Sequence, residues 1–243
     1  MIENRFLLDS EIQRRIPGIR ILLFTLRNVN QSDPVLQEKC QELLQSRWRD
    51  CRALFTGPTY AGVQSHPQLA AWRDCFKSLG IPIKKFVCSA ESLAKRAVKD
   101  PEPRSISPLV DFYNAISIRH LVSFGAFDLQ SLQGRCMTFR FTKEGDVYSA
   151  LDGTQEEKMP VGEAANICEP NTVLARHMNW RQSKFALIGN ESKDVVMVAA
   201  LLESLDNAAL DKLKTDIHEQ CKVLFDQETD IKIIHTAGEA VPY

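Results

Sequence analysis

The sequence predicts a protein of the α+β class, because segments of helical character and segments of strand character are grouped along the chain. Helical segments dominate up to residue 123, and a series of short β-rich runs follows between residues 135 and 202. One helix and one strand close the chain. The 243 residues suffice for one large domain or two small ones with a sizeable buried core.

Capping residues and apolar spacing define the elements of the first half. Pro34 directly after Asp33 predicts the start of a helix, and Gly80 predicts the end of another. We expect Ser89 and Ser107 to cap the two helices that follow. The expected elements are a strand over 19–28, helices over 34–53 and 66–80, a short strand over 81–87, and helices over 89–99 and 107–123.

In the second half the pattern changes to short strands. The expected strands cover residues 135–142, 146–151, 165–169, 172–175, 185–189 and 194–202. Asp206 is expected at the N-cap of a last helix over 207–221, and a strand over 231–236 follows it.

Composition and charge narrow the classes of function. Hydrophobic residues make up 44% and charged residues 25% of the chain, as in ordinary globular proteins. A net charge of −1 gives no general basic field, so any nucleic acid must meet a local patch. Seven scattered cysteines without a C-x-x-C pair predict free thiols and no metal site. No apolar run reaches the length of a membrane span, and we expect a cytoplasmic protein without membrane contact.

Residues 177–183, HMNWRQS, are unusual for a connection between two expected strands. They contain no Asn-Gly, Asp-Gly or proline, which tight turns commonly use. The stretch is either a large turn held by Trp180, or a platform on which an Arg-Trp pair and two amides bind something flat and anionic. The residues alone leave both interpretations open.

Three other features also have two interpretations each. Asn114, a poor helix former within a helix, either ties a neighbouring loop or faces a pocket. The histidine at position 120 is better explained as a hydrogen-bonded packing residue than as a base. One local cationic concentration is either a solvated helix face or a nucleic-acid-binding patch. It comprises Lys84, Lys85, Lys95, Arg96, Lys99 and Arg104.

Several stretches together resemble a known family. They are SAESLAKR (89–96), RSISPLVDFYNAIS (104–117), GAFDLQSLQG (125–134), LDG (151–153), PVGE (160–163) and RHMNWRQS (176–183). Their order and spacing resemble freestanding proteins similar to the tRNA-binding, editing domain of the phenylalanyl-tRNA synthetase β subunit. In the synthetase this domain hydrolyses tyrosine wrongly attached to phenylalanine tRNA. The resemblance implies a strand-rich, sandwich-like core flanked by helices. It also divides the chain into a helix/strand portion over 1–80 and an editing-domain-like core over 81–243, packed as one continuous unit.

The resemblance also implies the location of a pocket. It would be lined by the helix around residues 111–114, a loop over 125–128 and the HMNWRQS turn. The implied substrate-binding residues are Asp111, Asn114, Gly125, Asp128, Arg176, Asn179, Trp180, Arg181 and Gln182. An arginine in such a wall needs an acidic partner, and we expect Arg181 to pair with Asp111 or Asp128.

Two departures from the synthetase leave the chemistry open. Gly125 occupies the position of a histidine, and HMNWRQSK replaces a glycine-rich loop followed by a glutamate. The catalytic residues and the amino acid are therefore unassigned. One hypothesis is a tRNA-associated domain that deacylates a mischarged aminoacyl-tRNA in trans, without a cofactor and without being a full synthetase. The other is a non-catalytic module that binds tRNA or an amino acid. The expected partners are the acylated 3′ end of a tRNA and an amino acid or aminoacyl ester in the pocket.

Overall fold

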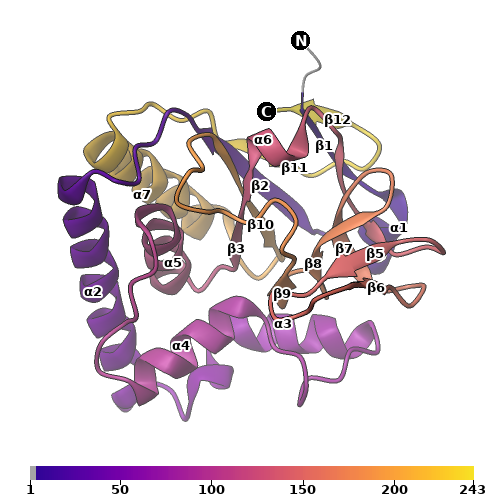
Figure 1. Ribbon diagram of the computed structural model, residues 1–243. Helices are drawn as coiled ribbons and strands as arrows, with labels where there is room; N and C mark the ends of the chain where they lie inside the picture. The colour runs from indigo at the N-terminus through magenta and orange to yellow at the C-terminus, as the bar shows by residue number, and fades with distance from the viewer. Residues whose placement is uncertain (1–3) are drawn as a thin grey trace.

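The computed structural model of the chain describes residues 4–243 and divides the strands found there between two sheets (Figure 1). The four-stranded sheet has the order β11 (Lys232–Ile234), β2 (Arg20–Leu26), β10 (Val195–Leu201) and β3 (Phe124–Asp128). The eight-stranded sheet begins with β12 (Ala240–Pro242), β1 (Arg5–Leu8), β4 (Met137–Phe141) and β7 (Ala164–Cys168). It continues with β8 (Thr172–Arg176), β5 (Val147–Ser149) and β6 (Glu156–Lys158), and β9 (Arg181–Gln182) pairs with β8 at its side.

The four-stranded sheet is the middle layer of the molecule. Every residue of β10 is buried, because its two faces pack on different layers. On one face Met197 and Phe24 pack with residues of the helices, while on the other face Val198 and Ile21 belong to a core cluster shared with the eight-stranded sheet. The layers are therefore helices, four-stranded sheet and eight-stranded sheet.

Three long helices cover the outer face of the four-stranded sheet. They are α2 (Pro34–Thr56), α5 (Pro108–His120) and α7 (Asn207–Phe225), and Figure 1 shows them together on one side of the molecule. Two of their starts follow the capping rules: Asp33 accepts a hydrogen bond from the Val35 amide (2.9 Å), and Asp206 accepts one from the Ala209 amide (2.7 Å).

Shorter helices complete the fold. They are α1 (Ser10–Arg15), α3 (Pro67–Ser78), α4 (Ser89–Lys99), α6 (Leu129–Leu132) and the 3₁₀ turn η1 (Val63–Ser65). Helix α4 crosses the lower end of the view in Figure 1, below the strands β3 and β9. Three of its residues, Ser89, Leu93 and Arg96, line the cavity described below.

The predicted α+β class and most predicted elements are confirmed, with four local corrections. Residues 81–87 form a turn and not a strand, because Pro82 lacks an amide proton and its carbonyl accepts the amides of Lys85 and Phe86. Residues 185–189 are also no strand, since Ala186 adopts a left-handed conformation (φ 55°) within a turn. The N-cap of α4 is Cys88 rather than Ser89. Strands β1, β3, β6, β9 and β12 had not been predicted, and β3 replaces the expected loop over 125–128.

The first 80 residues contribute to both sheets. Strand β1 pairs with β4 and β12, and β2 lies between β10 and β11. The proposed division of the chain at residue 80 remains a prediction.

Two further findings concern the composition. All seven cysteines are free thiols, and five of them are buried. No helix within residues 4–243 is long and apolar enough to cross a membrane.

Candidate functional site

A cavity of about 160 Å³ lies between the four-stranded sheet, helices α4 and α5, and the β8–β9 hairpin. Its floor is the face of the four-stranded sheet that is turned away from the long helices. Gly125 and Phe127 of β3 and Val198 and Ala200 of β10 line this floor, together with Ile21 of β2. The floor is therefore apolar.

Helix α5 supplies polar groups to the wall. Burial raises the pKa of Tyr113 to about 12, so its side chain is a neutral hydroxyl at physiological pH. Within residues 4–243, neither this hydroxyl nor the side-chain amide of Asn114 forms a hydrogen bond, and both residues line the cavity. These two side chains can therefore donate and accept hydrogen bonds to a ligand.

Two serine hydroxyls hold α5, β3 and α4 in place around the cavity. The Ser117 hydroxyl accepts a hydrogen bond from the Phe124 amide (3.3 Å), and the Ser123 hydroxyl accepts one from the Ala90 amide (3.0 Å). Both serines are buried and line the cavity. They fix the start of α4 against the end of α5, which positions Ser89 on the wall.

The stretch HMNWRQS contains the turn of the β8–β9 hairpin, residues 177–180, and the strand β9 that follows it. It reverses without glycine because His177 and Met178 adopt positive φ angles of 42° and 63°. Such conformations are costly for non-glycine residues and persist only where the surroundings enforce them. Two contacts do so: the Ser89 amide donates to the Asn179 carbonyl (2.9 Å), and the Asn166 side chain donates to the Met178 carbonyl (3.2 Å).

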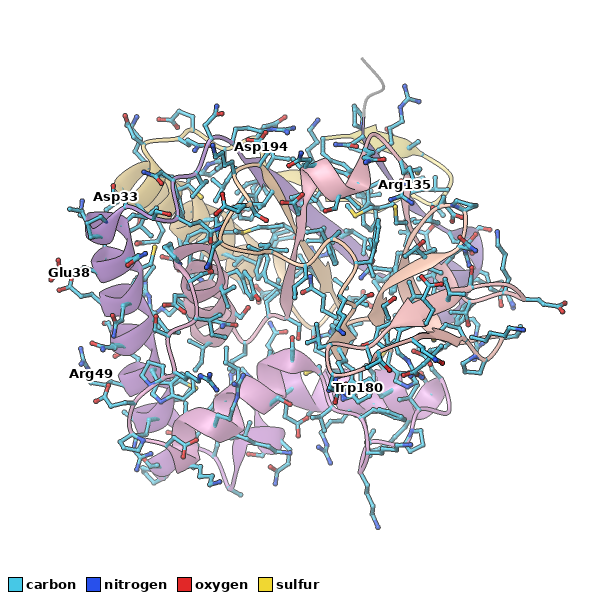
Figure 2. The ribbon with its side chains drawn as sticks, in the orientation of Figure 1. Asp33, Glu38, Arg49, Arg135, Trp180 and Asp194 are labelled. Carbon is cyan, nitrogen blue, oxygen red and sulfur yellow. The ribbon has the colours of Figure 1, made fainter. Side chains whose placement is uncertain are left out.

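Aromatic packing also fixes this turn. The Phe86 ring contacts the rings of His177 and Trp180, with centroid separations of 4.0 and 4.5 Å. Trp180 lies at the end of the molecule where α4 runs (Figure 2), and it also lines the cavity. The interpretation of HMNWRQS as a large turn held by Trp180 agrees with this packing. The stretch also lines the cavity, and whether it binds something flat and anionic remains a prediction.

A buried carboxylate lies behind the turn. Glu163 accepts two hydrogen bonds from the Arg176 guanidinium (3.0 and 2.8 Å) and one from the His177 amide (2.9 Å). The Arg176 guanidinium is therefore paired with the Glu163 carboxylate, and Arg176 does not line the cavity. Burial lowers the pKa of His177, and neither of its ring nitrogens has a hydrogen-bond partner among the described residues.

The structure brings together six of the nine residues proposed for substrate binding. Asn114, Gly125, Asn179, Trp180, Arg181 and Gln182 line the cavity, whereas Asp111, Asp128 and Arg176 do not. Asp111 accepts hydrogen bonds from Ser105 and from the Ile106 amide, which closes the loop before α5. Asp128 caps α6 through the Ser131 amide (2.9 Å). Whether the six residues bind substrate remains a prediction.

The prediction that Arg181 pairs with Asp111 or Asp128 was wrong. Its guanidinium pairs with Asp152 (3.1 Å) rather than with Asp111 or Asp128. Both side chains of this pair are well exposed, so its contribution to stability is small. Gln182 donates one amide proton to the Ala126 carbonyl (2.8 Å) and retains a second one for a ligand.

The predicted basic residues lie at the surface, and one of them, Arg96, lines the cavity. All six are exposed: Lys84, Lys85, Lys95, Arg96, Lys99 and Arg104. Lys95 is paired with the buried Glu91 (2.6 Å), which also binds Arg73. Arg96 lines the cavity, and no acidic residue in the described part of the chain pairs with it. Arg96 is therefore available to an anion at the cavity.

Five polar residues that line the cavity had not been predicted: Ser89, Tyr113, Ser117, Ser123 and Asn166. Asn166 had a recognisable signal, because it is the polar residue within the buried run AANIC of β7. Tyr113 gave no such signal, because it follows Phe112 in a largely apolar helix. Ser89 had been considered only as a cap.

The chemistry available in the cavity is limited to neutral polar groups and two arginines. Among the described residues that line it, none is a histidine, cysteine, aspartate or glutamate. Residues 4–243 also contain no group of three such side chains that could hold a metal ion. The cavity thus presents hydrogen-bond donors and positive charge, and its described wall contains no carboxylate or imidazole that could act as a base.

The sequence matches the B3/4 domain family over residues 71–241, and the chain therefore belongs to this family. The B3/4 domain is a domain of the phenylalanyl-tRNA synthetase β subunit, which confirms the relationship expected from the sequence motifs at this level. A solved N-terminal fragment of this subunit from Pyrococcus horikoshii is similar, with 9% identity and a TM-score of 0.42. The similarity covers 94% of this chain and 50% of that fragment, so the chain spans about half the fragment's length. No curated protein matches the chain in sequence.

Proposed function

We propose that the chain binds the acylated 3′ end of a tRNA and deacylates a mischarged amino acid in trans. The observation that carries the proposal is a cavity of about 160 Å³ with an apolar floor and unpaired polar groups on its wall. A protein cavity of about 150 Å³ can hold benzene, so this one is of the right scale for a single amino-acid side chain. Membership in the B3/4 domain family supports the association with tRNA.

Ester hydrolysis at this site needs no nucleophilic side chain. The oxygen of a water molecule forms a bond to the ester carbonyl carbon, the bond to the ribose oxygen breaks, and a water proton ends on that ribose oxygen. Donors on the wall stabilise the negative charge that develops on the carbonyl oxygen. The Tyr113 hydroxyl, the Asn114 amide and the second amide proton of Gln182 are candidates for this role.

The tRNA itself would meet the basic residues around α4. Arg96 can bind a phosphate at the edge of the cavity because it has no acidic partner in the described chain. Lys84, Lys85, Lys99 and Arg104 are exposed and offer further phosphate contacts. Binding that depends on such contacts weakens as salt concentration rises, because bound counterions are released from the nucleic acid.

One observation favours a second candidate function, a non-catalytic module that binds tRNA or an amino acid. The described residues of the cavity include no acidic, histidine or cysteine side chain, so no group on the wall can accept a proton from water at neutral pH. In this case the hydrogen-bond donors of Tyr113, Asn114 and Gln182 and the guanidinium of Arg96 would hold the ligand without cleaving it.

A panel of tRNAs carrying different amino acids tests the proposal. For each member, binding and amino-acid release are measured with wild-type protein, with Arg96→Ala and with Arg49→Ala. Arg49 is exposed on α2, far from Trp180 in Figure 2, and serves as the matched control. We expect release from at least one mischarged tRNA. Arg96→Ala should bind more weakly and reduce the slope of log affinity against log salt by about one, unlike Arg49→Ala.

The outcomes separate the candidates. Binding that protects the ester from hydrolysis would select the non-catalytic module. Absence of binding to every member would contradict the proposal and a tRNA-binding module alike, and would leave only a module that binds a free amino acid.

A further inference from the structure

Gly125 lies in the interior of β3, where neither the backbone nor the protein packing requires a glycine. It is paired with Val198 of β10, and its φ angle is outside the left-handed region. A Cβ atom added at this position would meet nothing closer than the ring of Phe127, at 3.6 Å, which is an ordinary van der Waals contact. An alanine would therefore fit the folded chain.

A glycine at such a position weakens the strand. It loses more conformational freedom on folding than other residues and offers no side chain to pack. A glycine inside a strand commonly marks the close approach of another group, and no protein atom approaches closely here. What lies beside Gly125 is the cavity, which it lines together with its same-face neighbours Phe127 and Val198.

We propose that Gly125 determines the specificity of the cavity by leaving room for the side chain of the bound amino acid. This inference rests on the proposed function and names its substrate class, an aminoacyl ester with an apolar side chain. The floor around Gly125 consists of Ile21, Phe127, Val198 and Ala200, which offer no polar side-chain group. The hydrogen-bonding groups come from α4, α5 and the β8–β9 hairpin, where they would meet the amino group, the ester and the nucleotide.

The test compares wild-type protein with Gly125→Ala and Gly125→Val. Binding and amino-acid release are measured for tRNAs carrying alanine, valine, leucine and phenylalanine, and the melting temperature is measured in parallel. Each added methyl group occupies space that a large side chain needs. We therefore expect the preference for the larger over the smaller amino acids to fall by roughly tenfold to two-hundredfold. The melting temperature of Gly125→Ala should equal or exceed that of the wild type.

Gly189→Ala is the matched control. Gly189 is exposed, does not line the cavity, and has open space where a Cβ would be placed. This variant should leave the substrate preference unchanged.

Three results would overturn the inference. A wild-type protein that acts on aminoacyl-tRNA and keeps its preference in both Gly125 variants would show that residue 125 does not set specificity, although the proposed function would stand. A Gly125→Ala protein that melts well below the wild type would show that the glycine serves the fold. A wild-type protein that binds no member of the panel would contradict the proposed function and this inference together.

Discussion

Asn114 has the properties of a residue that serves a ligand rather than the fold. Its side chain lines the cavity and forms no hydrogen bond within the described chain. We therefore expect Asn114→Ala to weaken ligand binding while the melting temperature stays almost unchanged.

Asn166→Ala is the contrasting variant. The Asn166 side chain donates a hydrogen bond to the Met178 carbonyl, and the loss of this bond should cost about 1–3 kcal/mol of stability. Thermal unfolding and binding of an uncleavable aminoacyl ester analogue provide the measurements. A clear drop in the melting temperature of Asn114→Ala with unaltered binding would favour a structural role.

Single residues were predictable from the sequence only in part. Asn114 and Gln182 were expected at a pocket and line the cavity, but the partner of Arg181 was wrong. Asp152 follows β5, and the parallel pairing of β5 with β8 brings it near the hairpin that carries Arg181. Sequence spacing does not reveal the register between these strands. The partner therefore could not be identified before the topology was known.

Three helices are joined by one carboxylate outside the cavity. Asp216 of α7 accepts hydrogen bonds from Arg47 of α2 (2.9 Å) and His120 of α5 (2.8 Å). Burial raises the pKa of Asp216, but the His120 hydrogen bond and the Arg47 charge lower it more, so it lies below its usual value. The stabilisation is therefore complete above about pH 4 and is lost as the pH falls through the lower pKa of the folded state.

Asp216→Asn should destabilise the protein by about 1.5–3 kcal/mol at neutral pH, because Arg47 and His120 lose the charged acceptor of their hydrogen bonds. The difference from the wild type should shrink below about pH 4, where the wild-type carboxylate also becomes neutral. Urea unfolding at several pH values measures both effects. Asp211→Asn is the control on the same helix, since Asp211 is exposed and should change stability by less than about 0.5 kcal/mol. A stability difference that stays constant down to pH 2 would contradict this account.

Helices were easier to predict than strands, for a physical reason. The starts of α2 and α7 are encoded locally, since Asp33 and Asp206 bond to amides two or three residues ahead. The apolar segments 81–87 and 185–189 resemble strands in composition. They form turns because Pro82 cannot donate a ladder hydrogen bond and Ala186 is held in a left-handed conformation. Strand formation depends on pairing with a distant strand, and neither segment forms such a pair within residues 4–243.

At the scale of the whole molecule, the order of helices and strands was sufficient to predict the α+β class. It could not predict that the four-stranded sheet is the middle layer, because β2, β3, β10 and β11 are dispersed between residues 20 and 234. The cavity depends on that layering. Its floor comes from the middle sheet, and its walls come from α4, α5 and the hairpin of the second sheet.

The central claim is that this cavity receives the aminoacyl end of a tRNA. A crystal structure with an adenosine that carries an apolar amino acid through an uncleavable 3′ amide tests the claim most directly. The amino-acid side chain is predicted to lie over Gly125, with the carbonyl oxygen within hydrogen-bond distance of Tyr113 or Asn114 and the nucleotide toward Arg96. A complex in which the analogue binds elsewhere and leaves the cavity without it would contradict the claim.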